Sequence, residues 1–206
     1  MKLFLSSYLI PDAKAFTDFV GKEPGDTKIG LVFNAKDYRA EEYRTDKRTM
    51  ITNYFSSRGF AIEIINLLDH PKGEGLLESF KRFDVVWFCG GNTFSLRYAI
   101  EESNCIPVLK KALAEGVIYA GDSAGAIAAG PTLRHFEMVD DATLPPRVIE
   151  EGMHLVDFAI LPHWDSPDYA AELPDIERNL KAEGFTTMRL LDSEYVLVED
   201  GEVLNK

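Results

Sequence analysis

The chain has 206 residues, of which 46 % are hydrophobic and 27 % charged, with a net charge of −12. This length predicts one domain, spanning 1–206, with a hydrophobic core large enough to fold without stabilising disulfides or metal ions. The acidic balance argues against a nucleic-acid-binding protein, because phosphate contacts require clustered lysines and arginines. Two cysteines, Cys89 and Cys105, are too few for a disulfide framework and fit a reducing compartment.

The N-terminal stretch reaches Asp12 before it builds the apolar core of a signal peptide, and no apolar run is long enough to span a membrane. We therefore expect a cytoplasmic protein with no membrane partner. From there on, short apolar runs alternate with helical patterns. The runs predict strands at 2–7, 28–35, 61–67, 84–90, 116–121 and 158–164. The helical patterns lie near 43–58, 73–81, 93–103, 105–115 and 168–183.

The strand runs are continuous rather than alternating, which is typical of strands covered on both faces. The sequence therefore predicts an α/β fold with a doubly wound, mostly parallel sheet. Gly59 and Gly184 follow two of the helices as C-terminal caps. Segment 131–157, with two adjacent prolines, is expected to leave the sheet. After it, 186–191 predicts one more strand, and 195–205 predicts a C-terminal β-hairpin turning at Glu199, Asp200 and Gly201.

The sequence GDSAG places Ser123 where a strand should turn into a helix. It fits the G-x-S-x-G pattern of a nucleophile elbow, in which flanking glycines relieve crowding across a sharp turn. A serine in an ordinary glycine-tolerant turn is the alternative. Ligands of open α/β sheets bind beyond the carboxyl ends of the strands, which is where Ser123 falls.

A second strand end, in WFCGGNTF, carries two glycines whose backbone amides are free of side chains. Such amides form oxyanion holes. The following Asn92 or Thr93 is the expected N-cap of the next helix. A Gly-rich turn is the alternative, and the absence of a following G-K-[ST] argues against a nucleotide P-loop.

A serine nucleophile needs a base within reach. Of the four histidines, His163 in LPHW ends a predicted strand at the same sheet edge as Ser123, which favours it over His70, His135 and His154. A packed or exposed histidine is the alternative.

The blocks CGGNTFSL, GDSAGAIAAGPTLR and LPHW, with an acid before a terminal hairpin, together resemble the peptidase E family. These are aspartyl dipeptidases, serine peptidases related to cyanophycinase. The resemblance implies a class I glutamine-amidotransferase-like fold and no metal or organic cofactor. It also implies that Ser123 is the nucleophile, that His163 is the base and that Gly91 and Ala124 supply the oxyanion amides.

The block LLDSEYVLVEDG resembles the family's acid block and places the triad acid at Asp192. Competing acids in the excursion are Glu137, Asp140 and Asp141. An α/β-hydrolase runs in the order serine, acid, histidine, which would favour Asp140 or Asp141. Against that order, the chain is short, and only forty residues separate Ser123 from His163.

The resemblance also implies dipeptide substrates with an N-terminal aspartate. An acidic protein needs a local cation to bind such a substrate. Arg134 and Arg178 are the candidates, with surface ion pairs as the alternative, and Asn92 is a further substrate-binding candidate. Asp122 is either a partner of the substrate amine, an exposed residue or part of a salt bridge. Cys89 is either a reactive thiol or a packed residue, and Trp164 walls the pocket or lies in the core.

Three functions are therefore in competition. The first is a serine exopeptidase that cleaves short peptides, the second an esterase-like acyl hydrolase of small molecules, and the third a non-catalytic binding module on the same fold. The combination of serine, histidine and acid favours an enzyme.

Overall fold

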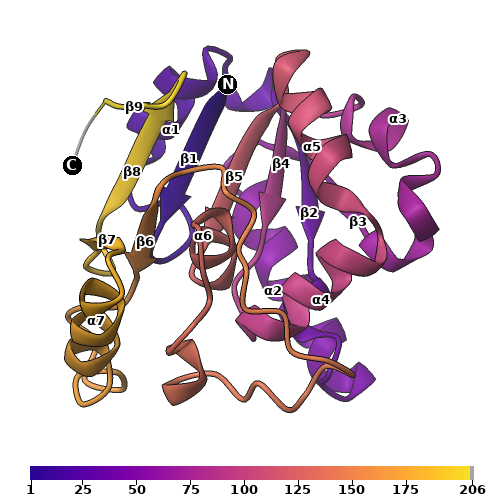
Figure 1. The fold of residues 1–206 in the computed structure, drawn as a ribbon. Coiled ribbons are helices and arrows are strands. Elements are labelled where there is room, and N and C mark those ends of the chain that lie inside the picture. The colour runs from indigo at the N-terminus through magenta and orange to yellow at the C-terminus, as the bar shows by residue number, and fades with distance from the viewer. Residues whose placement is uncertain (205–206) are drawn as a thin grey trace.

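The computed structural model describes residues 1–204, and a seven-stranded sheet runs through its centre in the order β3-β2-β4-β5-β1-β8-β9 (Figure 1). Five strands are parallel: β1 (Lys2–Ser6), β2 (Lys28–Val32), β3 (Ala61–Ile65), β4 (Val85–Phe88) and β5 (Ile118–Asp122). An antiparallel hairpin of β8 (Tyr195–Glu199) and β9 (Glu202–Val203) extends the sheet beyond β1.

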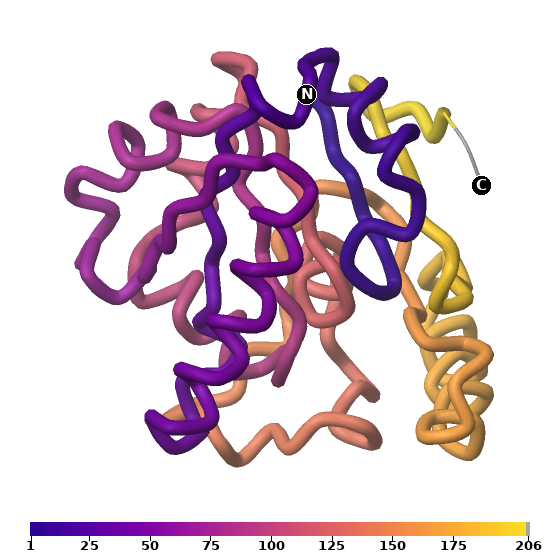
Figure 2. Tube along the Cα trace, turned by 180° about the vertical axis from the view of Figure 1, so that it is seen from behind, coloured from indigo at the N-terminus to yellow at the C-terminus, as the bar shows by residue number. Residues whose placement is uncertain are grey.

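Helices cover both faces of this sheet, as Figures 1 and 2 show from opposite sides. On one face lie α1 (Ala13–Val20) and α2 (Glu41–Ser56). On the other lie α3 (Leu76–Phe80), α4 (Thr93–Glu102), α5 (Cys105–Ala114) and α6 (Ala124–Ala129). Successive side chains of a strand point to opposite faces, so Phe4 and Trp87 pack toward α1 and α2, while Leu5 and Phe88 pack toward the other helices. This arrangement confirms the doubly wound, mostly parallel sheet.

The last two parallel strands do not join this sheet. β6 (Phe158–Leu161) pairs in parallel only with β7 (Thr186–Arg189), and α7 (Leu173–Ala182) packs on the pair. The predicted strand at 158–164 was therefore right in position but wrong in its sheet, because β8 occupies the place beside β1. Both strands still end near the carboxyl ends of the main sheet.

Local signals account for most element ends. Gly59 and Gly184 have φ of 93° and 90°, as expected of C-terminal caps. The hairpin turns through Asp200 and Gly201, both with positive φ, which is the type I′ geometry; residue 205 of the predicted hairpin lies outside the described residues. α1 was not predicted, although Asp12 caps it by accepting a hydrogen bond from the Ala15 N–H at 2.9 Å.

Segment 131–157 leaves the sheet, as expected, and crosses the lower front of the molecule in Figure 1. It contains one short 3₁₀ turn, Phe136–Met138, and is hydrogen-bonded to α4 and to the N-cap of that helix. Arg97 Nε donates to the Glu151 carbonyl at 2.6 Å, and Asn92 Nδ2 donates to the Asp141 carbonyl at 3.0 Å. These contacts bring Asp140 close to Ser123.

Candidate active site

Ser123 occupies the sharp turn between β5 and α6, with φ of 49° and ψ of −111°. This is a conformation that side-chain-bearing residues rarely adopt, and such strain concentrates at functional sites. The flanking glycines have no room for a side chain. A Cβ at Gly121 would lie 2.7 Å from the Gly125 carbonyl carbon, and one at Gly125 would lie 2.0 Å from the Phe88 carbonyl oxygen. The crossing of strand and helix thus requires both glycines of G-x-S-x-G.

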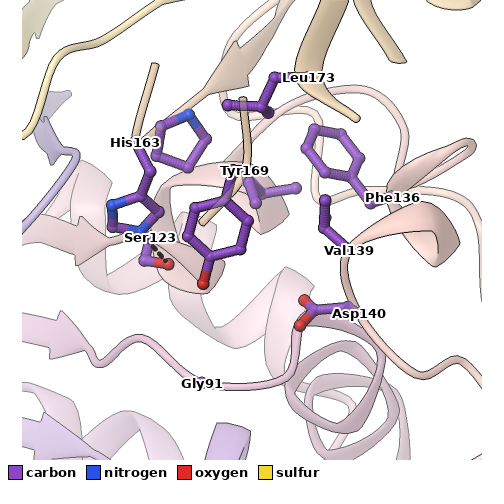
Figure 3. A pocket seen from close by; sticks show the side chains of 10 residues that line it. Gly91, Ser123, Phe136, Val139, Asp140, His163, Tyr169 and Leu173 are labelled. Carbon is purple, nitrogen blue, oxygen red and sulfur yellow. Dashed lines mark hydrogen bonds between the residues drawn. The ribbon is translucent and has the colours of Figure 1, made fainter. Parts of the chain in front are cut away.

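Three side chains from separate segments form a chain of hydrogen bonds at this turn. The distance between Ser123 Oγ and His163 Nε2 is 2.9 Å, and that between His163 Nδ1 and Asp192 Oδ1 is 2.6 Å (Figure 3 draws the first). His163 follows β6 and Asp192 follows β7, so the small separate sheet supplies two of the three groups. This is the connectivity of a nucleophile, a base and an orienting carboxylate.

The competing acids do not replace Asp192 in this chain. Asp140 lies near Ser123, but its carboxylate accepts a hydrogen bond from the Thr93 N–H at 2.8 Å. Asp141 bonds to Thr143, and Glu137 is exposed. Among the described residues, Asp192 is the acid that bonds to the His163 ring.

Further polar groups that the sequence reasoning missed fix the triad in place. The Ser7 hydroxyl lies 3.1 Å from Asp192 Oδ1, and the Asp192 N–H donates to Asp165 Oδ1 at 2.8 Å. The Tyr169 ring stacks on the His163 ring with centroids 5.2 Å apart. The one available signal was the serine pair at the carboxyl end of the first predicted strand, the edge where ligands bind.

The loop after β4 brings Gly91 beside Ser123 (Figure 3). Its φ is 147°, and a Cβ there would lie 2.6 Å from the Ala35 carbonyl oxygen, so only glycine fits. Across the serine, the Ala124 N–H is the first of α6 and has no intrahelical partner. Two backbone donors therefore lie on the serine's flanks, as an oxyanion hole requires.

Asp122 is neither exposed nor free to bind a substrate amine, which corrects those two readings of the sequence. It is 5 % exposed and accepts hydrogen bonds from Trp87 Nε1 at 2.6 Å and from the Gly90 N–H at 3.2 Å. Burial raises the pKa of this carboxyl, and the nearby Lys36 ammonium opposes that rise. Cys89 is fully buried, and burial raises its pKa well above the usual value, so it is a packed thiol rather than a reactive one.

Two hollows open on either side of Ser123 and share Gly91, Ser123, His163 and Tyr169. The first is narrow, has an apolar wall that includes Phe136 and Leu173, and carries the Asp140 carboxylate opposite Ser123 (Figure 3). Burial raises the pKa of Asp140. The second, of about 300 Å³, is lined by two lysines and by aromatic and apolar groups, among them Lys36, Lys47, Tyr8, Tyr43 and Met50. The buried Asp122 also lines the second hollow, and Lys36 bonds to the Gly90 carbonyl beside it, so Lys47 is the cation of this hollow that faces Ser123 from the side opposite Asp140.

Neither predicted arginine reaches these hollows, so the substrate-binding reading of both is corrected. Arg134 pairs with Glu183 at 2.9 Å, and Arg178 pairs with Asp175 at 2.6 Å on α7. These are the surface ion pairs that were the alternative. Asn92 caps α4, since its Oδ1 accepts from the Ser95 N–H at 2.8 Å, and its amide holds the excursion.

Trp164 packs in the cluster formed by β6 and α7, beneath the Arg189 guanidinium at 4.0 Å, and does not line either hollow. In residues 1–204, no group of three or more His, Cys, Asp or Glu side chains is placed to hold a metal ion. In the same range, no helix has the length and apolar character needed to cross a membrane.

Comparisons with known proteins give similarities over most of the chain. An uncharacterized peptidase of Pasteurella multocida is 25 % identical over 164 residues, covering 79 % of this chain and 77 % of the relative. Peptidase E of Streptomyces coelicolor is 36 % identical over 85 residues, which are 41 % of this chain and 34 % of that protein. A Listeria monocytogenes crystal structure described as a peptidase E protein has the same fold. Its TM-score is 0.83 at 21 % identity, covering 100 % of this chain and 97 % of that one.

The model of peptidase family S51 matches residues 6–205, nearly the whole sequence. Relatives named peptidase E and the shared fold agree with that match. The chain therefore belongs to peptidase family S51, the peptidase E family, and is a peptidase.

Proposed function

We propose that the protein is a serine peptidase in which Ser123 attacks the scissile carbonyl of a short peptide. The observation that carries this proposal is the chain of hydrogen bonds from Ser123 Oγ through the His163 ring to Asp192. His163 Nε2 takes the hydroxyl proton as the Ser123 oxygen bonds to the carbonyl carbon, and Asp192 stabilises the imidazolium that forms. The negative charge that develops on the carbonyl oxygen is stabilised by the N–H groups of Gly91 and Ala124.

Collapse of the tetrahedral intermediate breaks the C–N bond, and His163 gives its proton to the departing amine. A water molecule then attacks the acyl-Ser123 carbonyl, with His163 as its base, and releases the acid and the free serine. An esterase would use the same steps. The Asp140 carboxylate in one hollow and the Lys47 ammonium in the other favour a substrate that carries an ammonium and a carboxylate close to the scissile bond, as a short peptide does.

The proposal extends to dipeptides with an N-terminal aspartate. Asp140, whose hollow contains Ser123, is placed to pair with the substrate α-ammonium, which would make the enzyme an exopeptidase. Lys47 lines the other hollow and supports binding of the aspartyl side chain. Its ammonium lies 5.5 Å from the Tyr43 ring and has no ion pair with any residue of 1–204. The buried free thiols Cys89 and Cys105 suit action in the cytoplasm.

Reaction with a fluorophosphonate probe tests the nucleophile, and hydrolysis of Asp-Leu tests the reaction. We expect labelling at Ser123 and turnover of the dipeptide. Ser123→Ala should abolish both and keep the melting temperature, with a loss in kcat on the order of 10⁵–10⁶-fold by analogy with triad removal in serine proteases. A Ser123→Ala enzyme with near-wild-type kcat would refute the mechanism. Turnover of esters without turnover of peptides would favour the acyl hydrolase, and a protein that neither labels nor turns over would favour a binding module.

A further inference from the structure

The peptide unit that joins Gly90 to Gly91 is held at its carbonyl, and the peptide unit before it is held at its N–H. The Lys36 ammonium donates a hydrogen bond to the Gly90 carbonyl, and the Gly90 N–H donates to Asp122 Oδ2 at 3.2 Å. Peptide bonds of residues 1–204 are trans, so the Gly90 carbonyl and the Gly91 N–H point in opposite directions. Holding the carbonyl toward Lys36 therefore directs the Gly91 N–H away from it.

The backbone preferences of the two residues do not by themselves fix this orientation. Glycines flank the peptide unit on both sides, and glycine tolerates positive and negative φ about equally. A half-turn of the unit would change φ of Gly91 from 147° to a value of the opposite sign, which glycine also adopts. The carbonyl oxygen would then take the place of the N–H and would repel a developing oxyanion.

Lys36 is placed to prevent that half-turn. It ends a short 3₁₀ turn, Asn34–Lys36, whose Ala35 carbonyl accepts a hydrogen bond from the Asn92 N–H at 2.8 Å, just after the glycine pair. The turn is itself anchored, since Asn34 Nδ2 donates to Asn66 Oδ1 at 2.8 Å. The buried Asp122 carboxylate carries the opposite charge, and its attraction holds the Lys36 ammonium beside the loop.

We propose that Lys36 is a positioning residue of the oxyanion hole: it fixes the Gly90–Gly91 peptide so that the Gly91 N–H points at the substrate carbonyl oxygen. The inference rests on the proposed serine peptidase function and assigns Lys36 a different task from Lys47. Lys36 acts on the transition state of every substrate, whereas a substrate-binding lysine would act only on substrates that carry its anionic partner.

The test compares Lys36→Met, Lys36→Gln and Lys36→Arg with wild type. The readouts are the rate of fluorophosphonate labelling of Ser123 and the kinetics of Asp-Leu and Ala-Leu. Loss of an oxyanion donor costs about 10²–10³-fold in kcat, and we expect Lys36→Met to lose that much on both dipeptides and in labelling, with KM within about twofold. Gln and Arg retain N–H donors for the Gly90 carbonyl, so kcat and the labelling rate of these two variants should be at least tenfold higher than those of Lys36→Met. Lys110→Met, an exposed lysine on α5, controls for the removed charge.

Folding is checked by thermal unfolding, and ground-state binding is checked by calorimetric titration of Asp-Leu into Ser123→Ala with and without Lys36→Met, where we expect equal affinities. A folded Lys36→Met enzyme with wild-type labelling overturns the inference, as does a loss confined to Asp-Leu. If Lys36→Met does not fold, the test uses Lys36→Gln and the ratio of kcat/KM for Asp-Leu to kcat/KM for Ala-Leu. A ratio tenfold below that of wild type overturns the inference, whereas an unchanged ratio with slower labelling of Ser123 supports it. Failure of Ser123→Ala to abolish activity would instead refute the proposed function.

Discussion

The Ser7 hydroxyl accepts a hydrogen bond from the backbone N–H of His163 at 2.7 Å. His163 has a φ of 63°, a left-handed conformation that costs a non-glycine residue free energy unless the surroundings hold it. The same hydroxyl lies 3.1 Å from Asp192 Oδ1. The Ser7 side chain, just after β1, therefore links the main sheet to His163, which follows β6, and to Asp192, which follows β7.

We predict that Ser7→Ala lowers kcat by about tenfold and leaves KM nearly unchanged, because the imidazole loses orientation while the hollows keep their shape. Steady-state kinetics on Asp-Leu measures the effect. Ser6→Ala is the matched control, since Ser6 is equally buried and its hydroxyl bonds to the Leu9 carbonyl rather than to the triad. Equal losses in the two variants would mean that the Ser7 effect is one of stability.

The identity of the acid gives a second prediction. Asp192→Asn should lower kcat by about 10²–10⁴-fold, because an amide at His163 Nδ1 no longer stabilises the imidazolium or selects its tautomer. Asp140→Asn should change kcat by less than tenfold and raise KM for peptides with a free amine. Asp141→Asn is the control. The kcat values of the three variants on Asp-Leu identify the triad acid. The reverse ranking would place the acid in segment 131–157.

The sequence was most informative where one local rule decides the structure. Continuous apolar runs predicted the covered parallel strands, and the rule that ligands bind at carboxyl ends of strands placed Ser123 and His163 at one edge of the sheet. Asp192 came from the resemblance to the family's acid block, because three acids of segment 131–157 competed with it. Lys36 and Lys47 could not be recognised in the same way. One sits in a 3₁₀ turn and the other on a helix of weak amphipathic pattern, and only packing against the loop after β4 and the β5–α6 turn brings them beside Ser123. The arginines in the resembling block and on α7 were favoured for their chemistry, but abundant acids nearby neutralise them.

A third prediction concerns acid stability. The Arg189 guanidinium, together with Lys181 and Thr187, lowers the pKa of the buried Glu177 from 4.5 to about 2. A carboxyl whose pKa is lower in the folded state stabilises the fold above pH 4.5 and loses that contribution as the pH falls toward 2. Glu177→Gln should therefore cost on the order of 2 kcal/mol at pH 7 and much less at pH 2.

Urea unfolding of wild type and Glu177→Gln at pH 7, 4 and 2.5 measures this difference, with the exposed Glu42→Gln as the control. Because Glu177 ties α7 to β7, the strand that leads to Asp192, the variant should also lower kcat at neutral pH. A difference in stability that does not shrink toward low pH would contradict the assigned cause.

The last prediction concerns the basic hollow. An aspartyl carboxylate entering it meets the Lys47 ammonium, whose helix neighbours Arg44 and Arg48 are already paired with acids. Lys47→Met keeps an unbranched side chain beside Tyr43 and removes the ammonium that lies over its ring. We expect it to lower kcat/KM for Asp-Leu by roughly three- to tenfold, the size of a partly exposed ion pair, and to leave kcat/KM for Asn-Leu unchanged.

Arg134→Met and Arg178→Met are charge-matched controls outside the hollows and should keep the preference for Asp-Leu. Loss of that preference in either arginine variant, with Lys47→Met unaffected, would place the aspartyl site elsewhere. A wild-type enzyme that cleaves Asp-Leu and Asn-Leu equally well would remove the aspartyl specificity and leave the triad assignment intact.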